Sequence, residues 1–128
     1  MAPKSRTACT LEEQRLYMDD YFATDHLLTT AIGKFETLTD DATIAAERNP
    51  YRAQAIEAER QVELLRNKLR AFLDNEAAIN PPSMETVEKA KRLAEKLGKT
   101  AAKEAKGEAI IAMVANGLDA FNKIHAAA

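Results

Sequence analysis

Six basic residues recur at steps of three and four between positions 89 and 106, a spacing that suits chemistry with a charged ligand. They are Lys89, Arg92, Lys96, Lys99, Lys103 and Lys106. On a helix this spacing makes one ridge of about 25 Å, which fits phosphates or an acidic protein surface. Glutamates stand four residues before three of these bases, which favours ion pairs within the helix, and no aromatic residue is interleaved for base stacking. A solvated face is the simpler interpretation, and a contact with the acidic N-terminal third of the chain is an intermediate one.

The other residues able to do chemistry do not form a recognisable site. The Gly-Lys-Thr sequence at 98–100 matches only the end of a phosphate-binding loop, because Leu93 stands where that motif needs a glycine. His26 and His125 are far apart, and no Glu-x-x-His pair is present for a di-iron bundle. The acidic residues of the first segment, Asp20 among them, fit a solvated face. We therefore predict no catalytic, metal or cofactor site, and we expect that the protein is not an enzyme.

The elements that position these residues are indicated by an apolar seam between positions 51 and 79. Its members recur at steps of four and three and are interrupted only by Glu76. They are Tyr51, Ala55, Ala58, Val62, Leu65, Leu69, Phe72 and Ile79. Such spacing lays a narrow apolar stripe along one helix, the pattern with which one helix packs against another.

Helix start and stop signals predict three long helices, at about 11–47, 50–78 and 84–123. Thr10 and Glu13 have capping-box spacing, and the Asn-Pro pair at 49–50 suits the start of a second helix. The Asn-Pro-Pro-Ser run at 80–83 ends that helix and caps the next, because proline cannot donate to the helical ladder. Breaks near 37–40 and near Gly98 are left open. The fold class is all-α, as an antiparallel bundle or an elongated coiled-coil-like arrangement.

Composition limits the classes of protein that this chain can represent. With 128 residues, of which 46% are hydrophobic and 30% charged, it is one globular domain. We expect residues 1–9 to be a flexible tail and 10–128 a single helical domain. The formal net charge of −2 argues against a dedicated nucleic-acid binder. The chain shows neither a secretory signal nor an apolar run long enough to span a membrane, and Cys9 is its only cysteine. A cytoplasmic location is expected, although export by a signal-independent route would leave no mark.

Two functions of different classes follow from these patterns. The first is a non-catalytic protein–protein interaction module, of the kind that serves as an inhibitor or antagonist, a secretion-type chaperone or an assembly scaffold. Its partner would be another protein or a second copy of the chain, bound through apolar residues near the C-terminus: Ile110, Val114, Leu118 and Phe121. The alternative is a nucleic-acid-associated helical protein that uses the basic ridge at 89–106.

Overall fold

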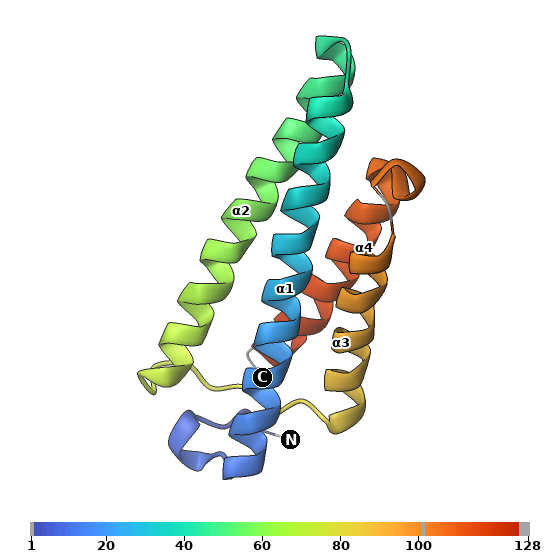
Figure 1. Cartoon of the computed structure of the whole chain (residues 1–128). Coiled ribbons are helices and arrows are strands. Elements are labelled where there is room, and N and C mark those ends of the chain that lie inside the picture. The colour runs from blue at the N-terminus through green and yellow to red at the C-terminus, as the bar shows by residue number, and fades with distance from the viewer. Residues whose placement is uncertain (1, 101, 126–128) are drawn as a thin grey trace.

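The computed structural model describes the backbone of residues 2–100 and 102–125, with their side chains outside 102–106. This part of the chain is all-α, as predicted, but it contains four long helices instead of three (Figure 1). The elements are a short 3-10 helix, η1 (Arg6–Ala8), and the helices α1 (Leu11–Asp41), α2 (Ala45–Leu73), α3 (Met84–Lys99) and α4 (Ala102–Ile124).

Helix α1 lies at the centre and packs against each of the other three helices. Consecutive helices run in opposite directions, so α1 and α3 run in the same direction, and α2 and α3 lie on opposite sides of α1 (Figure 1). A short connection was expected to make α2 and α3 antiparallel neighbours. The two helices are antiparallel but are not neighbours, because the segment 74–83 passes behind α1 in Figure 1 and carries α3 to its far side.

The first helix begins where the capping box predicts and ends earlier than predicted. Thr10 Oγ1 accepts from the Glu13 N–H at 3.0 Å, and the Glu13 carboxylate accepts from the Thr10 N–H at 2.8 Å. Helix α1 ends at Asp41, and α2 begins at Ala45. Pro50 therefore lies inside α2 and does not start it. Pro50 is the sixth residue of α2, so its missing N–H removes one ladder bond, the one to the carbonyl of Ala46.

Helix α2 ends at Leu73, five residues before the predicted end at 78. Asn75 has a φ of 62°, the left-handed conformation that asparagine tolerates better than most residues. The N–H of Glu76 reaches the carbonyl of Ala71 at 2.8 Å, and the N–H of Asn75 reaches the carbonyl of Phe72 at 3.1 Å. This pair of bonds is a Schellman motif, which closes the helix and satisfies its last carbonyls.

The last predicted helix is broken at Thr100, so the expected single helix from 84 to 123 is wrong and the break near Gly98 is correct. Thr100 has extended backbone angles, and its N–H bonds the carbonyl of Leu97 at 3.3 Å. Its hydroxyl donates to the carbonyl of Lys96 at 2.7 Å. Lys34 of α1 donates to the carbonyl of Thr100 at 2.5 Å, which ties the turn to the central helix.

The structure places residues 2–9 of the N-terminal segment against the end of α2 and the loop that follows it. Lys4 and Ile79 exchange backbone hydrogen bonds of 2.7 and 2.8 Å. Arg6 Nε donates to the carbonyl of Leu73 at 2.9 Å, at the negative end of α2. Cys9 is buried. The N-terminal segment is polar in composition. The backbone pairing of Lys4 with Ile79 and the burial of Cys9 hold it in place.

Two apolar clusters form the core, and α1 contributes to both because it is surrounded by the other helices. The first joins Cys9, Tyr17, Tyr21, Leu28, Val62, Leu65, Phe72, Ile79, Phe121 and Ile124. The second joins Leu27, Ala31, Phe35, Ala55, Ala94, Leu97 and Ile110. The seam prediction is confirmed, with Ile79 reaching the core from the loop after α2.

Candidate interaction groove

The apolar residues predicted to bind a partner divide into two groups on α4. Ile110 and Phe121 are fully buried in the core. In contrast to the prediction, they do not form part of an exposed partner surface. Val114 and Leu118 are only partly buried and line a cavity of about 140 Å³ between α2 and α4. Residues 110 and 121 lie on the stripe of α4 that faces α1, whereas 114 and 118 lie at its edge.

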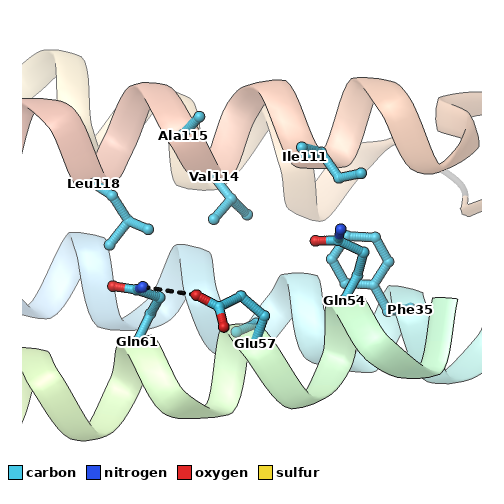
Figure 2. Close-up of a pocket in the computed structure, with 9 residues that line it drawn as sticks. Phe35, Gln54, Glu57, Gln61, Ile111, Val114, Ala115 and Leu118 are labelled. Carbon is cyan, nitrogen blue, oxygen red and sulfur yellow. Dashed lines mark hydrogen bonds between the residues drawn. The ribbon is translucent and has the colours of Figure 1, made fainter. Parts of the chain in front are cut away.

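The cavity between α2 and α4 has an apolar wall, a polar wall and an aromatic floor (Figure 2). Helix α4 supplies the apolar wall and α2 the more polar one, while Phe35 of α1 forms the floor. The lining residues are Phe35, Gln54, Glu57, Ala58, Gln61, Ile111, Val114, Ala115 and Leu118. Figure 2 shows Val114 and Leu118 pointing from α4 toward the side chains of Gln61 and Glu57. The sequence prediction omitted Ile111, which is 40% exposed, and Ala115.

The groove extends from this cavity toward the Thr100 end of the molecule. A second depression shares Gln54 and Ile111 with the first and is also lined by Pro50, Tyr51, Ala53, Gly107 and Glu108. At this depression the ring of Tyr51 on α2 lies close to the backbone of α4. Gly107 permits this contact, because a Cβ there would lie 2.7 Å from Cε1 of Tyr51. From Gly107 to Leu118 the groove follows α4 for about 16 Å. At its far end Lys68 donates to Asn122 at 2.5 Å and joins α2 to α4.

The polar wall of the groove is held in place by hydrogen bonds within α2. Arg60 Nη2 lies 2.7 Å from Glu57 Oε1, and Gln61 Nε2 donates to the same oxygen at 3.0 Å. These bonds, with that from Arg60 the stronger, lower the pKa of Glu57 to about 2. The carboxylate at the groove is therefore ionised at neutral pH and already oriented.

The predicted basic ridge is shorter than the sequence suggests. Lys89, Arg92, Lys96 and Lys99 are exposed on α3. Lys103 and Lys106 lie in α4, beyond the break at Thr100, and their side chains are outside the described residues. The six residues therefore do not share one helix. Lys89 Nζ also lies 3.4 Å from Glu85, so one of the four is paired within α3.

Buried polar groups on α1 and at the end of α4 were not expected from the sequence. Asp20 is 1% exposed, and its Oδ2 has no hydrogen-bond partner among the described residues. Burial raises its pKa to about 6, opposed by a hydrogen bond from Thr24. Tyr17 Oη lies 2.6 Å from His125 Nε2, and burial, with the positive charge of Lys68, lowers the pKa of His125 to about 4. Their burial depends on which face of α1 the other helices cover.

Metal-ligating side chains do not cluster in the part of the chain that the structure describes, where no three of them gather into a possible ion site. None of the helices, over their described residues, has the length and apolar character needed to cross a membrane. Comparisons with protein-family models, curated proteins and solved structures give no match. The groove is therefore interpreted from its geometry.

Proposed function

We propose that the protein is a non-catalytic interaction module that binds another protein through the groove between α2 and α4. The observation that carries the proposal is the uncovered apolar wall of α4. Ile111 is 40% exposed beside the partly buried Val114 and Leu118, although Ile110 and Phe121 on the adjacent stripe of the same helix are fully buried. Apolar surface gathered in a groove, with polar residues along its edge, is typical of protein-binding sites.

The open shape of the groove favours a macromolecule over a small ligand. Pockets for small molecules cover most of the ligand's surface. The cavity at Val114, about 140 Å³, continues past Tyr51 into an open depression of about 630 Å³ instead of closing. An elongated partner segment can use that whole length, whereas a compact ligand would touch only part of it.

Several biological roles use helical interaction modules of this kind. An inhibitor or antagonist, a secretion-type chaperone and an assembly scaffold each need a stable helical body with one apolar surface left open. A second copy of this chain is another possible partner, which would make the groove a self-interface. We further propose that the protein acts in the cytoplasm, because its free, buried Cys9 suits a reducing compartment.

The test compares two variants with matched chemistry and different positions on α4. Ala115→Arg places a long charged side chain in the groove, and Asn116→Arg places the same side chain on the exposed surface beside it. Light scattering over a range of concentrations reports self-association, and cross-linking followed by mass spectrometry identifies foreign partners. We expect Ala115→Arg to lose the complex and Asn116→Arg to retain it. Loss in both variants or in neither would place the interface elsewhere.

A second candidate function is nucleic-acid association through α3. It is favoured by the exposure of Lys89, Arg92, Lys96 and Lys99 on one helix, where a shallow depression is lined by the last three of them with Glu95 and Thr100. Binding to DNA or RNA should then weaken steeply as salt rises. The double change Lys96→Glu and Lys99→Glu should abolish it. Unchanged binding after this charge reversal would eliminate α3 as the site.

A further inference from the structure

The partner segment that fits the groove between α2 and α4 can be specified from the groove's backbone, charge and length. This inference rests on the proposed function, since it concerns the same site. We propose that the groove binds an amphipathic helix of a different protein that carries basic residues beside its apolar stripe.

The first step concerns the secondary structure of the occupant. Both walls of the groove are helices, α2 and α4, whose interior backbone groups are already hydrogen-bonded along the helix. An extended segment would find no free row of N–H and C=O groups with which to pair, and its own backbone would lose hydrogen bonds to water. A helix satisfies its backbone internally and presents only side chains. A groove of about 16 Å matches roughly three turns of helix.

The second step concerns the apolar stripe of that helix. Ile111, Val114 and Leu118 recur at steps of three and four along α4, and Phe35 lies at the Ile111 end of the cavity (Figure 2). A partner helix with large apolar residues at the same spacing would place them between α4 and the floor. Ala58 and Ala115 are small, so they leave room for the partner's side chains.

The third step concerns charge at the edges. Glu57 on α2 and Glu108 on α4 line the two depressions, and among the described side chains that line them none is basic. Arg60 pairs with both carboxylate oxygens of Glu57, at 2.7 and 3.0 Å, whereas Glu108 forms no ion pair with a described side chain. Lysine or arginine residues flanking the apolar stripe would meet both carboxylates, whereas acidic residues there would be repelled.

The fourth step separates a foreign helix from a second copy of the same chain. Helix α3 is the basic amphipathic helix of this protein, with Lys96 and Lys99 in its last turn. On its apolar side Val87 and Leu97 are fully buried against the rest of the fold. A folded second copy therefore cannot offer that helix to the groove, and a foreign helix is the better match.

The test uses two fluorescent peptides, each held helical by a side-chain staple, with the same leucine stripe. One carries lysines beside the stripe and the other carries glutamates, and binding is followed by fluorescence anisotropy. We expect the lysine peptide to bind about tenfold more tightly, because exposed ion pairs replace like-charge contacts. High salt should reduce this difference. Ala115→Arg should abolish binding, and Asn116→Arg should preserve it.

Charge reversal of the groove completes the test. The double change Glu57→Lys and Glu108→Lys should invert the preference between the peptides, and the milder Glu57→Gln with Glu108→Gln should remove it. Equal binding of both peptides, sensitive to Ala115→Arg, would overturn the charge assignment and leave the proposed function intact. No binding of either peptide, or binding indifferent to Ala115→Arg, would overturn the inference. The proposed function would then be decided separately by the cross-linking comparison.

Discussion

Helix α4 meets α1 along one side and faces α2 along another, and the two sides are filled differently. Toward α1, Ile110 and Phe121 are fully buried, and Gly117 lies so close to Leu27 that any added Cβ would overlap its side chain. Toward α2, Ile111 is 40% exposed, and a cavity of about 140 Å³ remains beneath it. The same helix therefore has a packed side and an open side.

The residues that face α4 explain this difference. Helix α1 presents Leu27, Ala31 and Phe35, which are apolar and pack with Ile110. Helix α2 presents Gln54, Glu57 and Gln61, whose polar ends stay hydrated and do not fill an apolar gap. The comparison teaches that burial against α1 stabilises the fold, whereas the apolar residues facing α2 contribute less and are available to a partner.

The largest expected effect separates the two sides directly. Phe121→Ala should lower the free energy of unfolding by about 3–5 kcal/mol, because it leaves a cavity in the core. The ring of Phe121 lies 5.9 Å from that of Tyr17 and 5.2 Å from that of His125. Ile111→Ala should cost only about 1 kcal/mol, since much of that side chain is already in water. Urea denaturation followed by circular dichroism measures both. Equal losses would show that the groove is closed in solution.

The second prediction concerns two titratable groups, the buried Asp20 on α1 and the partly buried His125 that contacts α1. The pKa of Asp20 is raised from 3.8 to about 6, so its contribution to stability is complete below about pH 4 and is lost as the pH rises through 6. The pKa of His125 is lowered from 6.5 to about 4, so its contribution is complete above pH 6.5 and is lost as the pH falls toward 4. The two groups therefore change the stability in opposite directions over nearly the same pH range.

In the native protein the pH dependences of stability from Asp20 and His125 oppose each other. Single substitutions should therefore reveal each one separately. Relative to the wild type, Asp20→Asn should gain up to about 3 kcal/mol between pH 4 and pH 7. His125→Gln should show the opposite trend, of similar size. Urea titrations at several pH values give both differences. A difference curve for Asp20→Asn that is flat with pH would mean that its carboxyl group is hydrated in solution.

The sequence could predict those features of the fold whose signal lies in neighbouring residues or within one helix. The caps at Thr10 and Ser83 depend on neighbouring residues, and both side chains accept the expected backbone hydrogen bonds. The apolar seam on α2 is likewise a property of one helix. The start of α2 was misplaced because Asn49 and Pro50 suit a helix start, yet also fit one turn inside it. The signal for the end of α2 was present in Asn75.

The candidate site depended on information that a single helix does not contain. Ile110 and Ile111 are adjacent and equally apolar, yet the first is fully buried and the second is 40% exposed. Which of them faces the core is decided by where α1 and α2 lie around α4. For the same reason Asp20, expected on a solvated face, is buried. Val114 and Leu118 were predicted for a partner surface, and they line the groove.

The third prediction tests how closely α4 approaches its neighbours on each side. Gly117→Ala should lower the free energy of unfolding by about 1–3 kcal/mol, because the new methyl group meets the fully packed Leu27. Gly107→Ala meets the ring of Tyr51, which is only partly buried and lies at the edge of the groove. The ring can shift toward solvent, so the loss should be smaller. Thermal unfolding of the two variants ranks them, and a larger loss at Gly107 would reverse the assignment of packed and open sides.

The smallest effect should come from Gly33, an exposed glycine in the interior of α1 where no neighbour restricts a side chain. An added Cβ there meets nothing within 4 Å, and α1 continues through this position without a break. Gly33→Ala should therefore raise the free energy of unfolding by about 0.5–1 kcal/mol, because alanine loses less backbone entropy in a helix. The gain should be visible as a higher urea midpoint with an unchanged slope.

The result at Gly33 also calibrates the losses at the other two glycines. Each Gly→Ala change includes the same favourable entropy term, so the steric cost at Gly117 or Gly107 is the measured loss plus the gain at Gly33. Each steric cost is therefore larger than the measured loss, whereas the difference between Gly117 and Gly107 is unchanged. If Gly33→Ala instead lowered the free energy of unfolding, α1 would need a glycine at this position for a bend in solution. The central helix would then be less rigid than its packing against the other helices suggests.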